Sequence, residues 1–144
     1  METYELKINT KEFLGMLSNY FTLKLEKPIQ VKEKHSIGYE GIYEDRVVNV
    51  EIYYEEQIEI LGHIATKTTT LDKDEIKAIL NELIDNENYT ITSFNYNTNI
   101  ETKGYYRDEY DEAVFKGVTI NAKEKQKQLR KWWYEAIWNR HVWR

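Results

Sequence analysis

The sequence of 144 residues contains no cysteine, only one proline and six glycines. Without cysteine there is no disulfide, no zinc–thiolate site and no cysteine nucleophile, and this composition suits a reducing compartment. With so little proline and glycine, and no low-complexity tract, long disordered linkers are not expected. No stretch approaches the roughly 18 apolar residues of a membrane-spanning helix, and no signal peptide or transit peptide is recognisable. We therefore expect a soluble, cytoplasmic protein that does not associate with membranes.

Catalytic motifs are also scarce. The three histidines are far apart in the sequence and none belongs to a zinc motif of the HExxH kind. The chain has no GxSxG nucleophile motif and no glycine-rich phosphate-binding loop. We therefore expect no catalytic residue, no metal and no cofactor.

One acidic pattern leaves a catalytic hypothesis open. Asp85 followed by Glu101 and Lys103 resembles the Asp…Glu-x-Lys arrangement of restriction-type nucleases. In that arrangement the carboxylates hold Mg²⁺ and the lysine steadies the attacking water. Because the chain is rich in Glu and Lys, such a match is expected by chance, and a metal-dependent hydrolase is the third of three functional hypotheses.

Tryptophan is missing from residues 1–131, and all four tryptophans fall in the last thirteen residues. From residue 123 onward there are seven Lys/Arg and two Glu, a net charge of +5. Residues 1–122 carry thirteen Lys/Arg and twenty-three Asp/Glu, a net charge of −10, and the two values sum to the −5 of the whole chain. Such asymmetry indicates a partner, a membrane surface or a helix that folds back on an acidic body.

Hydrophobic periodicity and turn residues predict the order of the elements. They indicate a strand over 2–8, a helix over 11–21 capped near residue 9, a strand from 29, turns at 36–41 and 44–45, a helix over 72–84, and strands over 89–96 and 114–120. Between these, alternation over 48–54 predicts a strand with one buried face, which resumes at Ile58, Ile60 and Ile64 after a turn or bulge near 55–57.

The C-terminal residues predict an amphipathic helix. Asn121 and Glu124 have the spacing of a capping box, which places this basic, tryptophan-rich helix at about 122–143. Its apolar stripe follows the i, i+3, i+4, i+7, i+8 pattern of a docked helix, with Leu129, Trp132, Trp133, Ala136 and Ile137. We predict one α+β domain over 1–144, with a mostly antiparallel sheet of about five to seven strands packed by two or three helices, this one included.

Acidic and aromatic residues supply the candidate binding surface. Glu51, Tyr53 and Glu55 share the predicted exposed face of one strand. A second cluster contains Tyr105, Tyr106, Asp108, Glu109 and Tyr110. Three C-terminal residues do not fit the apolar stripe and are of types enriched at interfaces, namely Trp138, Arg140 and Trp143.

These observations favour a non-catalytic protein-binding module that acts through an acidic, tyrosine-rich surface on a partner with a basic surface. Lys outnumbers Arg fifteen to five, and Ile (fifteen) and Asn (eleven) exceed Ala (five), which is typical of AT-rich genomes. This composition, the small size and the lack of catalytic motifs resemble those of proteins encoded by phages and mobile elements, including anti-CRISPR proteins. The resemblance covers no motif and transfers no residue. It implies an inhibitor of a host defence protein that acts in the host cytoplasm.

The alternative is a nucleic-acid-binding accessory protein that uses the basic C-terminal helix. The net charge of −5 opposes this alternative. The oligomeric state and any small-molecule ligand are left open.

Overall fold

The computed structural model describes residues 2–84 and 87–125. Along the chain these form β1 (Thr3–Ile8), α1 (Thr10–Leu25), β2 (Val31–Glu40), β3 (Asp45–Ile60), β4 (His63–Leu71), α2 (Lys73–Leu83), β5 (Tyr89–Lys103), the 3₁₀ turn η1 (Tyr106–Asp108) and β6 (Tyr110–Glu124). Strands account for 58% of the described residues and helices for 25%, so this part of the chain is mostly β.

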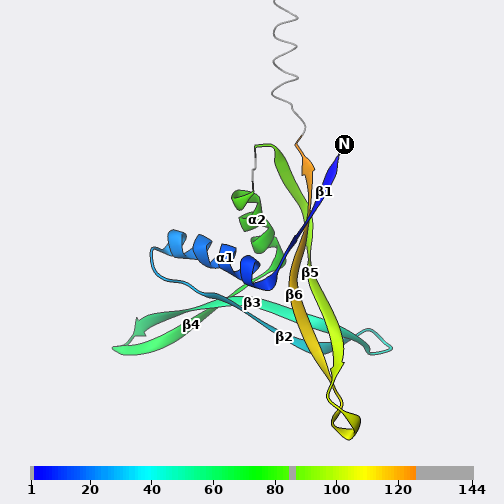
Figure 1. The fold of residues 1–144 in the computed structure, drawn as a ribbon. Helices are drawn as coiled ribbons and strands as arrows, with labels where there is room; N and C mark the ends of the chain where they lie inside the picture. The colour runs from blue at the N-terminus through cyan, green and yellow to red at the C-terminus, as the bar shows by residue number, and fades with distance from the viewer. Residues whose placement is uncertain (1, 85–86, 126–144) are drawn as a thin grey trace, which may run out of the picture.

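The strands form two separate three-stranded sheets, and every pairing in them is antiparallel (Figure 1). One sheet has the order β1-β6-β5 and the other β2-β3-β4. In the first sheet β1 pairs with β6, so strands from opposite ends of the described chain lie side by side. Helix α1 contacts β6 and β2, while α2 contacts β5. The helices therefore occupy the angle between the two sheets.

Both helices begin where their capping residues predict. The Asn9 side chain accepts a hydrogen bond from the Glu12 amide at 2.8 Å and opens α1. Asp72 accepts from the Glu75 amide at 2.8 Å in the same way and opens α2. These caps satisfy amides that have no partner within the helix. Most of the predicted apolar spacing is also confirmed, because Phe13, Leu17 and Phe21 of α1 and Ile76, Ile79 and Leu80 of α2 are buried. Leu83, which the same spacing places on the buried face of α2, is instead 44% exposed.

One hydrophobic core joins both sheets and both helices. Its most deeply buried side chains come from four different elements, with Phe13 and Leu17 on α1, Ile52 on β3, Ile76 on α2 and Val118 on β6. Among the described residues, no buried side-chain nitrogen or oxygen lacks a hydrogen-bond partner. The centre of the molecule is therefore a closed apolar core, and a candidate site has to be sought on its surface.

The predicted fold class is wrong in its architecture. Instead of one sheet of five to seven strands with two or three helices, the described residues form two three-stranded sheets with two α-helices. The predicted start of the C-terminal helix is also wrong, because residues 122–124 belong to β6 and pair with β1 and β5. The rest of that predicted helix lies outside the described residues.

Several strand boundaries differ from the prediction: β5 and β6 are longer than expected, and two strands run through predicted turns. β3 runs without interruption through the turn expected near 55–57 and ends only at Ile60. β2 runs through the turn expected at 36–41, because Gly38 lies within it, opposite Val47. A Cβ on Gly38 would stand 2.2 Å from Nδ2 of Asn49, so this glycine allows a close side-chain approach rather than a turn.

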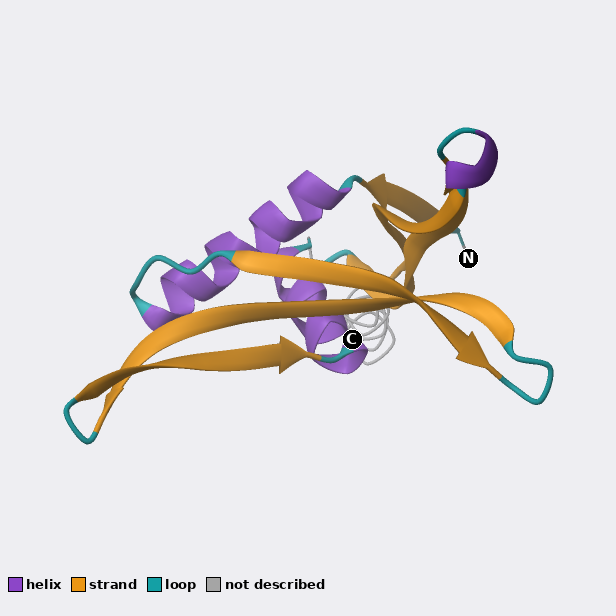
Figure 2. Ribbon diagram, turned by 90° about the horizontal axis from the view of Figure 1, so that it is seen from below, coloured by secondary structure: helices purple, strands orange, loops and turns teal. Residues whose placement is uncertain are grey.

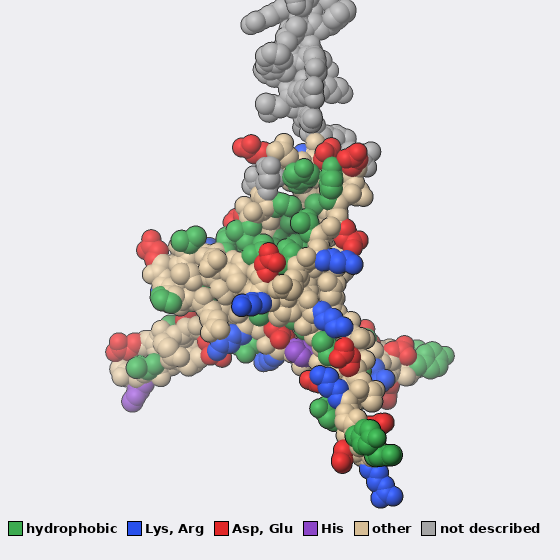
Figure 3. Space-filling model, in the orientation of Figure 1, with side chains coloured by type: hydrophobic (Ala, Val, Ile, Leu, Met, Phe, Trp, Pro, Cys, Tyr) green, Lys and Arg blue, Asp and Glu red, His purple; other side chains and the backbone are tan. Residues whose placement is uncertain are grey.

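Three hairpins extend from the core as arms (Figure 3). The β2–β3 arm ends at residues 41–44, the β3–β4 arm at residues 61–62, and the β5–β6 arm at the loop that contains η1. β3 belongs to two of these arms, which extend in opposite directions (Figure 2). In the middle of β3, Ile52 and Tyr54 are buried, whereas Ile60 near its end is exposed. The helices therefore cover only the centre of the β2-β3-β4 sheet.

Candidate functional site: two acidic, tyrosine-bearing hairpin tips

The β2–β3 tip (residues 39–45) is an acidic turn with large apolar side chains in solvent. Gly41 and Glu44 both have positive φ angles, and the Glu44 amide donates to the Gly41 carbonyl at 3.2 Å, which closes the turn. Ile42 is 95% exposed and Tyr43 89% exposed. Three carboxylates of this tip form no ion pair with any described residue, namely those of Glu40, Glu44 and Asp45.

The β5–β6 tip (residues 105–110) combines the same residue types. Gly104 begins the turn with φ +94°, and a Cβ there would stand 2.2 Å from the Asp108 carbonyl oxygen. The rings of Tyr105 and Tyr106 meet edge to face at 4.4 Å between centroids, and Tyr106 is 79% exposed. Asp108 and its neighbour Glu109 form no ion pair within the described part of the chain. The predicted acidic, tyrosine-rich cluster is thus one exposed hairpin end.

A hydrogen-bonded ion pair connects the two arms behind their tips. The Arg46 guanidinium of β3 donates to one carboxylate oxygen of Asp111 on β6, and the Thr102 hydroxyl donates to the other at 2.8 Å. The Thr102 hydrogen bond and the adjacent Arg46 both lower the pKa of Asp111. This junction links the two arms behind their tips, and both of its charged side chains are partly exposed.

The junction should make stability depend on pH. Because the pKa of Asp111 is lowered in the folded state, its contribution is present above the unfolded value, about 3.9, and is lost as the pH falls through the folded value. Asp111→Asn should therefore lower the midpoint of thermal unfolding slightly at pH 7, and the difference should vanish in acid. Circular dichroism melts measure both effects. Asp108→Asn, on the same arm without an ion pair, is the control, and equal behaviour of the two variants would contradict the assignment.

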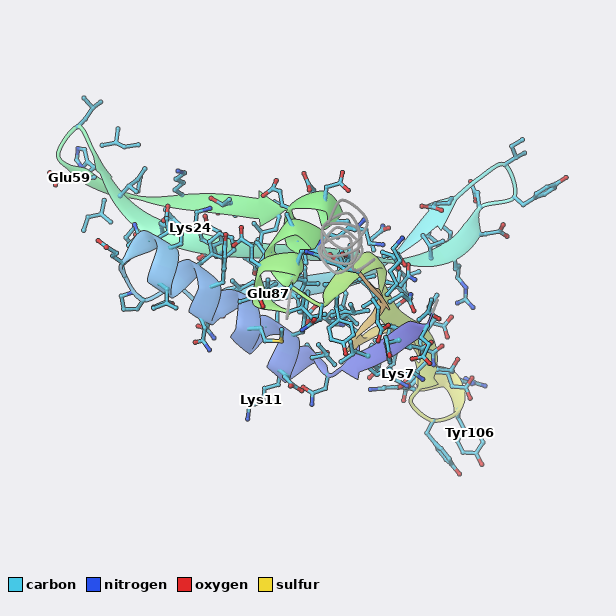
Figure 4. All side chains as sticks on the ribbon, turned by 90° about the horizontal axis from the view of Figure 1, so that it is seen from above. Lys7, Lys11, Lys24, Glu59, Glu87 and Tyr106 are labelled. Carbon is cyan, nitrogen blue, oxygen red and sulfur yellow. The ribbon has the colours of Figure 1, made fainter. Side chains whose placement is uncertain are left out.

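The two tips project to the same side of the molecule, away from the β3–β4 arm. In Figure 4 the β5–β6 tip, marked by Tyr106, and the β2–β3 tip lie at one end of the molecule. Glu59, near the end of the β3–β4 arm, lies at the other end. Figure 2 shows the same separation from below. At this end of the molecule the two tips diverge, the β2–β3 tip above and the β5–β6 tip below in Figure 4, so a partner that contacts both has to bridge the space between them.

The predicted row of Glu51, Tyr53 and Glu55 lies elsewhere, on the outer face of β3. Within the described residues no hydrogen bond, ion pair or ring contact joins this row to either tip. Its charge is partly neutralised, because Lys34 of β2 forms an ion pair with Glu51 at 3.2 Å and lies over the Tyr53 ring at 5.2 Å. A shallow pocket of about 170 Å³ beside it is lined by Lys34, Ser36, Asn49 and Glu51, among others. The row forms a mixed polar face rather than an acidic one.

The residues of the nuclease hypothesis do not form a metal site in the described structure. Glu101 pairs with Lys116 at 3.4 Å, and Lys103 pairs with Glu112 at 2.8 Å, both along the β5–β6 arm. The Glu112 hydrogen bond raises the pKa of Lys103, so this lysine is held in its charged form. No group of three or more Asp, Glu or His among the described residues is placed to hold a metal. Asp85 lies outside the described residues.

The remaining predicted residues, Trp138, Arg140 and Trp143, also lie outside the described residues. The sequence predicted turns near the β2–β3 tip, at 36–41 and 44–45, but did not single out its exposed Tyr39, Ile42 and Tyr43 as candidate binding residues. It also placed Ile60 and Ile64 on a buried face, and this is wrong, because both are exposed at the end of the β3–β4 arm.

No helix in the part of the chain that the structure describes is both long and apolar enough to cross a membrane. Comparison of the chain with protein-family models, with curated proteins and with solved structures finds no match.

Proposed function

We propose that this protein is a non-catalytic binding protein whose partner is another protein, and that the β2–β3 and β5–β6 tips form its contact surface. The observation that carries the proposal is the exposure of Ile42, Tyr43, Tyr105 and Tyr106 at the ends of two arms linked by one ion pair. Single exposed apolar residues are ordinary on protein surfaces, but such clusters at projecting tips are typical of interaction sites.

The residue types at the tips suit a protein partner. Tyrosine offers a large contact area with few rotatable bonds, so it loses little entropy when it becomes ordered in an interface. The unpaired carboxylates around these rings attract a basic surface and repel an acidic one, which accelerates the correct encounter. The proposed partner therefore has apolar pockets with a rim of lysine and arginine.

The test uses the tagged full-length chain to capture partners from a lysate of the source cells, followed by titration of each purified candidate. Tyr43→Ala and Tyr106→Ala should each cost about 2 kcal/mol of binding free energy, roughly a 30-fold increase in Kd. Leu23→Ala, at an exposed leucine of α1 outside both tips, is the matched control and should bind as the unsubstituted chain does. Equal Kd values for all three variants would exclude the tips as the contact surface.

Charge-reversal variants distinguish binding through the tips from binding through the row of Glu51, Tyr53 and Glu55 on β3, the β3 row. Glu40→Lys and Asp108→Lys should lower the association rate and weaken its dependence on salt. Glu55→Lys, on the outer face of β3, should have a smaller effect if the tips alone meet the partner. An equal or larger effect of Glu55→Lys would assign the contact to the β3 row.

Two functional hypotheses stay predictions. Inhibition of a host defence protein derives from size and composition, and gene neighbourhood is the observation that tests it. Nucleic-acid binding derives from the basic C-terminal residues, which lie outside the described part of the chain. It predicts binding of single-stranded oligonucleotides that weakens steeply with salt.

A further inference from the structure

An apolar strip on the β1-β6-β5 sheet is left uncovered by the two helices. Tyr4 and Leu6 lie on the core-facing side of β1, in register with Ala122 and Ile120 of β6, which are buried. Nevertheless Tyr4 is 37% exposed and Leu6 44% exposed. The ring of Tyr89 from β5 meets Tyr4 edge to face, with 5.5 Å between centroids. The core face of this sheet therefore continues beyond the area that the described elements cover.

The strip continues onto α2, which packs against β5 and ends with the exposed Leu83. In Figure 3 hydrophobic side chains gather between the positions that α2 and β1 occupy in Figure 1. We call this surface, formed by Tyr4, Leu6, Leu83 and Tyr89, the uncovered strip. Half-exposed apolar residues on a core face leave room for a further packing element, so the strip suits an occupant with an apolar face of its own.

The described chain ends at one end of this strip. The Lys125 amide donates to the Asn88 carbonyl at 2.8 Å, directly before β5 begins. The Tyr4 hydroxyl donates to the Glu124 carboxylate at 3.2 Å, which joins the end of β6 to the strip itself. Nineteen residues, 126–144, continue from this point. Of the residues outside the described structure they form the longest continuous segment, and they follow directly from Lys125.

The sequence of residues 126–144 complements the strip in two ways. Its apolar residues, beginning at Leu129 and ending at Ile137, follow the spacing of one helix face. Only three residues separate Lys125 from Leu129, which is an ordinary length for a strand–helix connection. The segment carries five Lys/Arg and one Glu. Carboxylates lie at the strip, since Tyr4 donates to both Glu2 and Glu124.

We propose that the uncovered strip is the docking site of this chain's own residues 126–144, which cover it as a helix through Leu129, Trp132, Trp133 and Ile137. The basic side chains of the segment then lie near the carboxylates of Glu2 and Glu124. Trp138, Arg140 and Trp143 do not belong to this stripe and extend past it. The proposal involves no partner, so it stands or falls independently of the proposed function.

Tryptophan fluorescence of the full-length chain tests the docking directly, because all four tryptophans lie in the segment. In the unsubstituted protein part of the emission should be blue-shifted and protected from acrylamide, since the docked indole rings of Trp132 and Trp133 leave water while Trp138 and Trp143 extend past the strip. Leu6→Lys and Leu83→Lys place a charge in the strip and should shift the emission to the red and increase quenching. Leu61→Lys, at the exposed tip of the β3–β4 arm, is the matched control and should leave both quantities unchanged.

Three results would overturn the proposal. The first is emission typical of solvent-exposed tryptophan in the unsubstituted protein. The second is emission in Leu6→Lys and Leu83→Lys that is unchanged from the unsubstituted protein, as in the Leu61→Lys control, while circular dichroism shows that all three variants remain folded. The third is emission that shifts to the red on dilution as the mass from light scattering falls from dimer to monomer, because the occupant would then be a second copy. Blue-shifted emission that is independent of concentration and sensitive only to the strip variants supports docking within one chain.

Discussion

Replacing Gly117 with alanine is expected to lower the free energy of unfolding by about 3–5 kcal/mol. Gly117 has φ +116°, a conformation that residues with a Cβ rarely adopt. A Cβ at this position would stand 2.0 Å from the carbonyl oxygen of Ile8 and 2.8 Å from Cα of Asn9. Because these are backbone atoms, they cannot move aside as the end of a flexible side chain can.

The location of Gly117 makes this clash costly. It lies in β6 at the register shift opposite residues 96–98 of β5, where the segment between β1 and α1 crosses closely over the strand. The Thr10 hydroxyl, at the start of α1, donates to the Phe115 carbonyl at 3.0 Å in the same region. Alanine would push the segment of Ile8 and Asn9 away from β6. The contacts that β1 and α1 make with β6 would then weaken together.

Urea titration followed by circular dichroism measures the loss. Gly15→Ala is the control, because a Cβ at Gly15 in α1 meets no atom within 4 Å. That substitution should stabilise the protein by roughly 0.5–1 kcal/mol, since alanine is the better helix former. The two alanine variants should therefore change stability in opposite directions. A Gly117→Ala protein as stable as the unsubstituted chain would show that β1 does not approach β6 this closely.

Phe13→Ala should also cost about 3–5 kcal/mol, by leaving a cavity in the core. Phe13 is fully buried, and its ring lies edge to face against Phe115 at 6.4 Å and Tyr96 at 6.5 Å between centroids. These contacts join α1 to both long strands of the β1-β6-β5 sheet, so few neighbouring side chains are free to fill the space.

The control for Phe13→Ala lies on the same helix. Leu23 is exposed, so Leu23→Ala should change the free energy of unfolding by no more than about 0.5 kcal/mol. Denaturant titrations of both variants give the comparison. If both substitutions had equally small effects, α1 would not be packed through Phe13.

The two helices could be predicted from the sequence because their signals are local. An Asn or Asp cap and an apolar stripe at helical spacing lie within one short segment, and both segments fold as these signals indicate. The division of the strands between two sheets has no such signal. β1 pairs with β6 across most of the chain length, and alternation along a strand does not identify the neighbour of that strand.

The errors near Glu56 and Asn121 each have a physical cause. Glu56 interrupts the apolar alternation of β3 and so indicates a turn, yet its side chain is nearly buried and pairs with Lys27 at 3.2 Å and Lys67 at 4.0 Å. An ion pair from distant segments thus replaces the apolar residue that the pattern requires. The spacing of Asn121 and Glu124 suits a capping box, but both residues lie in β6, where strand pairing satisfies the backbone.

The candidate site could be predicted only in part. The run of tyrosines and acids around Tyr106 marks the β5–β6 tip in the sequence, since such a run cannot be buried. Its association with the β2–β3 tip depends on the pairing of Arg46 with Asp111, which are far apart in the sequence. The residues outside the described structure leave the C-terminal part of the predicted site a prediction.

The length of β3 has a consequence for anything that binds this protein. The strand contains 16 residues, which at roughly 3.3 Å per residue span about 50 Å. One end leads into the β2–β3 tip and the other into the β3–β4 turn, so the length of β3 sets the spacing between these two ends of the molecule. Deleting two residues would shorten the strand by about 7 Å and keep every side chain on its face of the sheet. Deleting one residue would move the side chains on one side of the deletion to the opposite face.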